Sequence, residues 1–449
     1  MGRLFGTDGV RGIANTELTC ERALDIGRAA AEVLSEGCDH RPLFVVGSDT
    51  RTSSDMLMCA VAAGICSMGA DVISLGVVPT PAVAFLVGKY KADAGVMISA
   101  SHNPSEFNGI KIFSADGYKL PDALEERIEA IVLDHESKLE RPVGKEVGRL
   151  RFSADGVKDY SEHLKGSVPS MLSGVKVAID CANGSASVSA AKLFSDLGAD
   201  ATILNASPDG SNINENCGST HIDVLAKFVT ENGFDCGIAF DGDADRCLAV
   251  DELGNIIDGD MIMAICALDL LERGKLNHRA VVGTIMTNFG FGKFCEANGL
   301  KFVATKVGDR FVLEEMLLED YSFGGEQSGH IIFREFATTG DGQLTACQLL
   351  SLIARKKKKL SELASVMTRY PQTMVNLKVS AEGKLLFYTD KEIKEAIESA
   401  KEELGKTGRI VVRPSGTEPL IRVMTEGENM TQIEEITERV ASVIKKRLS

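Results

Sequence analysis

Three stretches of the chain repeat one pattern, and this repeat limits the fold more than any other feature of the sequence. In each, a short apolar segment leads through a polar or glycine-containing loop into a helix, a glycine and a second apolar segment. The stretches are residues 43–78, 175–205 and 280–308. Strand, helix and strand in this order form a βαβ unit with parallel strands and a right-handed crossover. The repeat therefore predicts three related α/β domains.

The last part of the chain has a different pattern. Residues 409–427, RIVVRPSGTEPLIRVMTEG, read as strand, tight loop and strand, and an amphipathic helix follows from about Thr431 to Leu448. This order is typical of an α+β domain. We therefore place three α/β domains at residues 1–155, 156–254 and 255–369, and a smaller α+β domain at 370–449.

Composition narrows the class of protein. The net charge of −15 argues against a nucleic-acid partner, because phosphate backbones are bound by basic surfaces. No segment approaches the ~18 apolar residues that a membrane span needs, and the first residues lack the apolar core of a signal peptide. The 11 cysteines form no CxxC pair, which favours reduced thiols. We expect a cytoplasmic protein without membrane contact.

A serine stands at a marked change of polarity in the first domain. The apolar run from Ala94 to Ile98 is followed by SASHNP, which contains Ser101. Asn-Pro favours the start of a turn. Taken alone, this serine could be a nucleophile, a phosphate-binding hydroxyl or only part of a turn.

Three carboxylates alternate in the second domain. Asp241, Asp243 and Asp245 lie between two apolar strands in the sequence FDGDADRCLAVD. Alternate side chains of an extended segment point the same way, so the three could converge on a cation, and oxygen ligands suit Mg²⁺. An EF-hand is excluded, because Arg246 occupies the glycine position and strands flank the loop. An acidic β-turn is the alternative.

Two further loops are rich in polar groups. GEQSGH, residues 325–330, offers Glu326 and Ser328 at alternate positions, where both could contact sugar hydroxyls. RPSGTEP, residues 413–419, combines guanidinium, hydroxyl and backbone N–H groups, which can bind phosphate without a metal. A plain loop and a plain hairpin turn are the respective alternatives.

Together the loops match the needs of a sugar phosphomutase: a serine to carry the phosphoryl group, a cation, a sugar-binding loop and a separate phosphate site. The chain resembles the α-D-phosphohexomutase superfamily over essentially its whole length, from GRLFGTDGVRG to RPSGTEPLIRVM. FGTDGVRGIAN, ISASHNP, FSADGYKLPD and GGEQSGHII most resemble the bacterial phosphoglucosamine mutases. The resemblance implies four domains around a central cleft, three of them related α/β domains with mixed sheets and the last α+β.

The resemblance also implies site residues, motif by motif. Ser101, and not Ser99, would be phosphorylated, and we expect the turn to expose it for this modification. Mg²⁺ would be held by a phosphoserine oxygen with Asp241, Asp243 and Asp245. The residues implied at the reaction centre are Arg11, Lys111 and His330, with Arg246 and His102 near the metal. Those implied to bind substrate are Lys306, Gly308, Asp309, Arg310, Glu326, Ser328, Arg413, Ser415, Gly416, Thr417 and Arg422.

The implied reaction interconverts glucosamine 6-phosphate and glucosamine 1-phosphate through a bound 1,6-bisphosphate, and its product feeds UDP-N-acetylglucosamine synthesis. Glucose or glucosamine 1,6-bisphosphate is implied as an activator. No residue in the sequence can be assigned to contact the 2-amino group of the sugar. A phosphoglucomutase or phosphomannomutase is therefore the main alternative. A metal-dependent sugar phosphatase and a non-catalytic sugar-phosphate binding protein are others. The general acid or base is open between His330 and Lys111, and a homodimer is left open.

Overall fold

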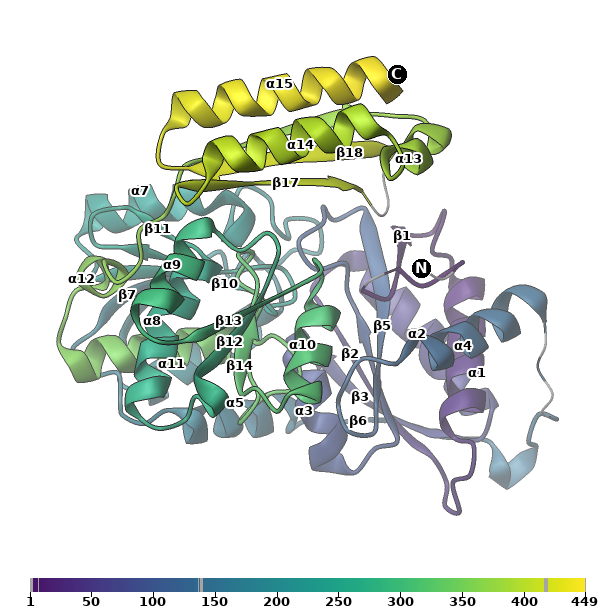
Figure 1. Cartoon of the computed structure of the whole chain (residues 1–449). Helices are drawn as coiled ribbons and strands as arrows, with labels where there is room; N and C mark the ends of the chain where they lie inside the picture. The colour runs from purple at the N-terminus through teal and green to yellow at the C-terminus, as the bar shows by residue number, and fades with distance from the viewer. Residues whose placement is uncertain (1–2, 7, 136, 138–139, 416–418, 449) are drawn as a thin grey trace. The chain divides into compact units, whose positions relative to one another are not determined.

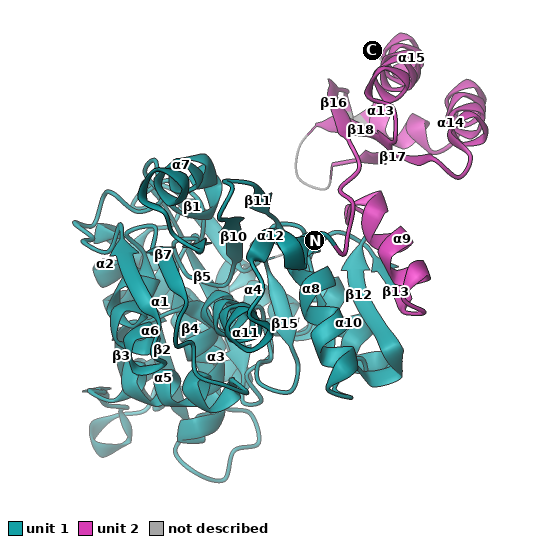
Figure 2. Cartoon of the chain, turned by 90° about the vertical axis from the view of Figure 1, so that its left-hand side faces the viewer, with its two compact units in different colours: residues 1–284, 303–365 teal, residues 285–302, 366–449 magenta. Residues whose placement is uncertain are grey.

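The structure is a computed structural model that describes residues 3–6, 8–135, 137, 140–415 and 419–448. Contacts divide the chain into two compact units (Figure 2). Unit 1 comprises residues 1–284 and 303–365, and unit 2 comprises residues 285–302 and 366–449. Within the described residues the strands form four sheets.

The first sheet, in unit 1, has the strand order β1-β5-β4-β2-β3-β6. Its strands are β1 Val10–Ile13, β2 Leu43–Ser48, β3 Asp71–Val77, β4 Ala94–Ile98, β5 Phe107–Ser114 and β6 Leu150–Phe152. The accompanying helices are α1 Cys20–Leu34, α2 Thr52–Ser67, α3 Thr80–Tyr90 and α4 Asp122–Asp134. β2 pairs with β3 and β4 in parallel, and β5 pairs with β1 and β4 antiparallel.

Alternating residues of this sheet face different helices. Phe44 and Val46 of β2 and Val96 of β4 belong to the apolar core that also holds α1, α2 and α4, which lie together on one face in Figure 1. On the opposite face α3 approaches closely. A Cβ atom on Gly95 would come within 2.5 Å of the Val87 side chain, so only glycine fits between strand and helix. The sheet thus carries helices on both faces.

The second sheet has the order β11-β10-β9-β7-β8. Its strands are β7 Lys176–Asp180, β8 Asp200–Leu204, β9 Cys236–Phe240, β10 Cys247–Asp251 and β11 Ile256–Ile257. The helices of this region are α5 Gly156–Ser167, α6 Ala190–Asp196 and α7 Ile222–Asn232. β7 pairs in parallel with β8 and β9, whereas β10 runs antiparallel to β9. The parallel pairs β2–β3 and β7–β8 confirm the βαβ units predicted from the first two repeats.

The third sheet has the order β13-β12-β14-β15. Its strands are β12 Ala280–Thr284, β13 Lys301–Thr305, β14 Phe323–Gly325 and β15 Ile331–Phe333. The helices of this region are α8 Gly259–Glu272, α9 Phe289–Ala297, α10 Asp309–Leu318, α11 Gly342–Lys356 and α12 Leu360–Ala364. β12 and β14 are parallel, and β14 and β15 are antiparallel, so this sheet is mixed as well.

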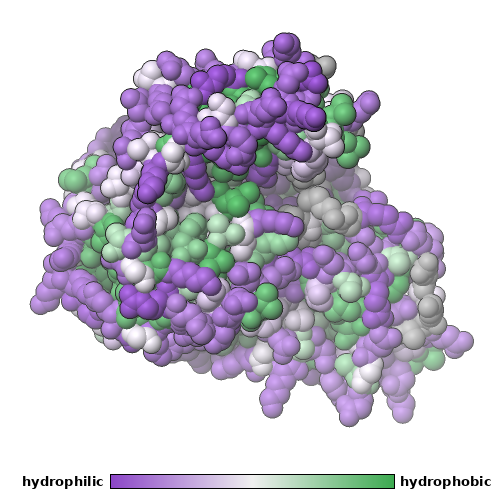
Figure 3. All heavy atoms as spheres, in the orientation of Figure 1, coloured by the Kyte–Doolittle hydropathy of each residue, from purple (hydrophilic) through white to green (hydrophobic). Residues whose placement is uncertain are grey.

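Unit 2 contains the antiparallel sheet β16-β18-β17. Its elements are β16 Gln372–Lys378, α13 Ala381–Phe387, α14 Lys391–Leu404, β17 Gly408–Pro414, β18 Leu420–Gly427 and α15 Met430–Leu448. Ile393 of α14 and Ile436 of α15 pack on Val423 of β18. The surface over α14 and α15 is mostly hydrophilic (Figure 3), as expected for amphipathic helices.

Residues 285–302, which include α9, group with unit 2 and not with the rest of the predicted third domain. Hydrogen bonds within unit 2 account for this. The Asn288 side chain donates to the Glu426 carboxylate and to the Tyr370 carbonyl, each at 3.1 Å, and the Phe289 N–H donates to Glu426 at 3.2 Å. The repeat pattern describes local structure and carries no information about such pairings.

Candidate active site

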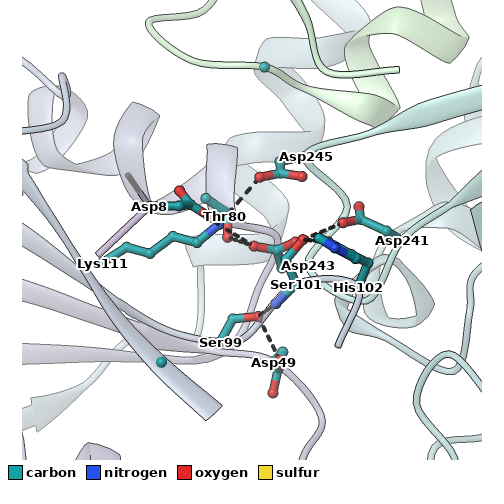
Figure 4. A network of polar contacts seen from close by, with 12 residues as sticks. Asp8, Asp49, Thr80, Ser99, Ser101, His102, Lys111, Asp241, Asp243 and Asp245 are labelled. Carbon is teal, nitrogen blue, oxygen red and sulfur yellow. Dashed lines mark hydrogen bonds and ion pairs between the residues drawn. The ribbon is translucent and has the colours of Figure 1, made fainter. Parts of the chain in front are cut away.

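The turn that contains Ser101 follows β4 directly. Ser101 has a left-handed backbone, with φ of 53°, and its side chain is buried, with 1% of the residue exposed. Its Oγ donates to Asp241 at 2.6 Å and lies 3.3 Å from His102 Nδ1 (Figure 4). The expectation that the turn exposes this serine is wrong, because the loop after β9 lies against it. A Cβ atom on Gly242 would be only 2.6 Å from the Ser101 carbonyl oxygen.

The predicted acidic loop lies between β9 and β10, and its carboxylates converge. Asp241, Asp243 and Asp245 are buried, and each offers an oxygen within 4.8 Å of those of the other two. Asp243 Oδ2 accepts from Thr80 at 2.6 Å and from Lys111 at 2.9 Å. Among the described residues, Asp243 Oδ1 and Asp245 Oδ1 have no hydrogen-bond partner. Buried acceptors without donors are suited to a hard cation such as Mg²⁺.

The electrostatics of this cluster reflect crowding of like charges. Burial, followed by the neighbouring carboxylates of Asp245 and Asp243, raises the pKa of Asp241. Burial of Asp243 acts in the same direction, but the charge of Lys111 and the hydrogen bonds from Lys111 and Thr80 together outweigh it and lower the pKa of Asp243. Burial, with the charges of Arg246 and Arg11, lowers the pKa of His102 to about 4. His102 is therefore a neutral imidazole near pH 7.

A chain of alternating charges leads away from the acidic cluster within unit 1. Lys111 lies 3.1 Å from Asp8, whose other oxygen is 2.5 Å from Lys119. Lys119 also pairs with Asp309, which lies 3.4 Å from His330 Nε2. The sequence interpretation missed Asp8 and Lys119, although both stand in motifs that it quoted, FGTDGVRG and FSADGYKLPD.

Two loops predicted to bind substrate, residues 306–310 and residues 325–330, lie together. The Gly308 N–H donates to Glu326 at 3.1 Å. The backbone of Arg246, beside the acidic loop, forms an isolated β-bridge with His330. Lys119, Asp309 and His330 line a cavity of about 140 Å³. Ser328 is half-buried and lies on the same loop as Glu326, between β14 and β15.

Other predicted residues have partners that sequence reasoning did not foresee. Arg11 pairs with Asp8. Arg310 forms ion pairs with carboxylates of α4, including Glu125 at 3.5 Å. Lys306 is exposed, and its ammonium group lies 5.6 Å from the centre of the Phe311 ring.

The predicted phosphate site belongs to unit 2. Arg413 of β17 and Arg422 of β18 are direct cross-strand partners. Burial and the charge of Arg422 lower the pKa of Arg413. Like charges placed opposite each other destabilise a sheet, and an anion between them would relieve the repulsion. Ser415 is buried at the end of β17, and Gly416 and Thr417 lie outside the described residues.

Family models match four consecutive parts of the chain. They describe phosphoglucomutase/phosphomannomutase alpha/beta/alpha domains I, II and III and the C-terminal domain, and match residues 2–139, 158–254, 258–370 and 374–443. A phosphoglucosamine mutase from Caldanaerobacter subterraneus subsp. tengcongensis is 55% identical over 449 residues, which is 100% of both chains. The chain belongs to the phosphoglucomutase/phosphomannomutase family. The predicted superfamily is confirmed, as are the three α/β domains with mixed sheets and the C-terminal α+β domain, and the chain is a mutase.

Solved structures of other proteins share this fold. A family member from Burkholderia thailandensis has a TM-score of 0.84 at 22% identity, with 99% of this chain and 98% of that chain covered. An N-acetylphosphoglucosamine mutase from Aspergillus fumigatus, in complex with GlcNAc-6P and magnesium, has a TM-score of 0.69 at 18% identity, with 99% and 96% covered. No helix in the described part of the chain is long and apolar enough to span a bilayer.

Proposed function

We propose that this mutase interconverts glucosamine 6-phosphate and glucosamine 1-phosphate through phosphorylated Ser101. The observation that carries the proposal is the 55% identity to a phosphoglucosamine mutase along the full length of both chains. The short contact between the Ser101 hydroxyl and Asp241 supports the choice of nucleophile, because it places this hydroxyl at the edge of the acidic cluster.

Phospho-Ser101 would transfer its phosphoryl group to the free hydroxyl of the bound sugar phosphate. The bond between Ser101 Oγ and phosphorus breaks, a bond to the sugar oxygen forms, and the hydroxyl proton ends on Ser101 Oγ through a base of the site. The 1,6-bisphosphate then turns around and returns its other phosphate to Ser101. Lys111 and Arg11 would stabilise the charge on the transferring group, since phosphoryl transfer depends mainly on positioning and electrostatics. His330 and Lys111 remain the candidates for proton transfer.

The acidic loop would hold one Mg²⁺ through Asp241, Asp243, Asp245 and a phosphoserine oxygen. The all-oxygen donor set fits this ion, and so do the two carboxylate oxygens that have no partner among the described residues. When bound, the ion neutralises negative charge on the phosphoryl group. Glucose or glucosamine 1,6-bisphosphate would act as activator by phosphorylating Ser101.

We further propose a cytoplasmic protein whose partner is a small sugar phosphate. All eleven cysteines are free, which agrees with a reducing compartment. Binding to nucleic acid is disfavoured by the net charge of −15. A homodimer stays open, and light scattering of the purified protein would decide it.

Turnover of two substrates tests the assignment. We expect kcat/KM for glucosamine 1-phosphate to exceed that for glucose 1-phosphate by at least about tenfold, equivalent to about 1.4 kcal/mol of transition-state discrimination. Both are assayed with the same enzyme preparation, Mg²⁺ concentration and bisphosphate activator. Equal or higher kcat/KM for glucose 1-phosphate would favour the phosphoglucomutase alternative. Release of inorganic phosphate without isomerisation would favour the phosphatase.

Arg422 tests the phosphate site of unit 2. If Arg422 holds the phosphate that does not react, its contacts exist in both the ground state and the transition state. We expect Arg422→Ala to raise KM about tenfold or more, with a smaller fall in kcat. Arg439→Ala, which removes a half-exposed arginine of α15, is the matched control and should leave both constants unchanged. A large fall in kcat at unchanged KM would show that Arg422 acts on the transferring phosphoryl group.

A further inference from the structure

We propose that Arg51 and Asn214 are positioning residues that hold the Ser101 turn in its reactive conformation. This inference rests on the proposed function, because it concerns the same phosphoryl transfer. Together, the side chains of Arg51 and Asn214 are termed the turn clamp. Arg51 lies between β2 and α2, and Asn214 lies in the loop that follows β8, so the turn is held from two domains.

The side chain of Arg51 donates hydrogen bonds to Asp49 and to carbonyl groups of the Ser101 turn. Its side chain is fully buried and pairs with Asp49, which is also fully buried, at 2.9 Å. The guanidinium group donates to the carbonyl oxygens of Ser101 at 2.9 Å, Asn103 at 2.8 Å and Phe107 at 3.0 Å, and to that of Pro104. A buried arginine is costly unless its charge and its N–H groups are satisfied. Here the turn itself supplies most of the acceptors.

Asn214 reaches the same carbonyl groups from the other domain. Its Nδ2 donates to the Ser101 carbonyl at 2.9 Å and to the Asn103 carbonyl at 3.2 Å. The reversed amide would place its oxygen against two carbonyl oxygens, so the contacts themselves set the orientation of the side chain. The carbonyl groups of Ser101 and Asn103 therefore each accept from both members of the turn clamp.

The turn needs such support because its backbone is strained. Ser101 has a φ of 53°, and a left-handed backbone is unfavourable for a residue with a side chain. Its N–H also donates to Ser99 Oγ at 2.9 Å, and Ser99 in turn donates to Asp49 at 2.6 Å. Because the backbone on both sides of Ser101 is held, its Cβ stays at a position from which Oγ reaches Asp241.

The acidic loop is fitted against the turn clamp. A Cβ atom on Gly242 would lie 2.6 Å from the Ser101 carbonyl oxygen and 2.9 Å from Asn214 Nδ2, so only glycine allows this approach. The turn, the turn clamp and the loop that carries Asp241 and Asp243 thus form one close-packed group. A shift of the turn would change the distance between Ser101 Oγ and the carboxylates, and misplacement by about 1 Å can cost about a hundredfold in rate.

The experiment removes the clamp from the Asn214 side without adding charge or strain. Asn214 has a φ of 60°, which glycine adopts readily, so Asn214→Gly deletes only the side chain. Asn216→Gly is the matched control, because Asn216 lies in the same loop, has a φ of 52° and is exposed. Any effect of glycine on the unfolded chain is then shared by the two variants. Arg51→Lys tests the other side, since lysine keeps the charge and loses the planar fork.

We expect kcat to fall about tenfold or more in Asn214→Gly and in Arg51→Lys, with KM changed by less than about threefold. Hydrogen exchange of the amides in residues 98–107 should become faster in both variants, whereas Asn216→Gly should match the wild type in kcat and in exchange. If the two side chains only stabilised the fold, the variants would melt at a lower temperature, but kcat would not fall while KM stays nearly unchanged.

The outcomes separate this inference from the proposed function. Wild-type kcat and wild-type exchange in Asn214→Gly, measured on an active parent enzyme, overturn the turn clamp. If the wild-type chain shows no mutase activity while exchange of residues 98–107 still rises in Asn214→Gly and Arg51→Lys but not in Asn216→Gly, the proposed function is overturned, and the inference that both side chains hold the turn is supported.

Discussion

Ser101→Ala should abolish mutase activity, with a fall in kcat of at least about a thousandfold, because the variant has no oxygen to carry the phosphoryl group. The fold should survive. The lost hydroxyl makes a buried hydrogen bond to Asp241 and a longer contact with His102, and deleting one such bond costs on the order of 1 kcal/mol. Steady-state kinetics with glucosamine 6-phosphate and a thermal melt of the same sample measure both effects.

Ser105→Ala is the control for this variant, because Ser105 lies on the same turn and is only half-buried. It should keep wild-type kcat. An active Ser101→Ala enzyme would remove Ser101 from the mechanism, and a poorly folded one would be recognised from its melt.

Asp243→Asn should lower activity about a hundredfold or more, because a neutral amide is a much weaker ligand than a carboxylate for a hard cation. The same change takes a negative charge from beside Lys111, which now lies 2.9 Å from the carboxylate. High Mg²⁺ should restore activity only in part. Titration of activity with Mg²⁺ measures the expected rise in the concentration needed for half-maximal rate.

Asp235→Asn, an exposed aspartate just before β9, is the matched control for the loss of one carboxylate. It should respond to Mg²⁺ as the wild type does. The wild-type enzyme should also lose activity in a chelator and regain it with added Mg²⁺. Full activity of the chelated enzyme would rule out a metal at the acidic loop.

The parts of the fold that depend on local pattern could be predicted from the sequence. The apolar segments around residues 43–78 and 175–205 form the expected parallel pairs, and the hairpin from Gly408 to Gly427 with the helix after it lies where the C-terminal pattern placed it. The convergence of the three aspartates was predicted correctly, but the extended segment assumed for it was wrong, because residues 241–245 form a turn in which Ala244 has a φ of 56°.

What the sequence did not reveal depends on contacts between distant residues. Ser101 was expected to be exposed, because a turn after a strand normally is, but a loop about 140 residues later covers it. Asn214 touches the turn across a separation of 113 residues, and Lys119 meets Asp309 across 190. No period or motif in a single sequence encodes such pairings.

The most direct test of the account follows the phosphoryl group itself. The wild-type enzyme is treated with glucosamine 1,6-bisphosphate, freed of small molecules and mapped by peptide mass spectrometry, then mixed with glucosamine 6-phosphate and mapped again. We expect one phosphoryl group on the peptide that contains Ser101, lost on mixing as the bound bisphosphate appears and absent from Ser101→Ala. An active enzyme without phosphate on Ser101, or one whose phosphate leaves as inorganic phosphate, would contradict this expectation.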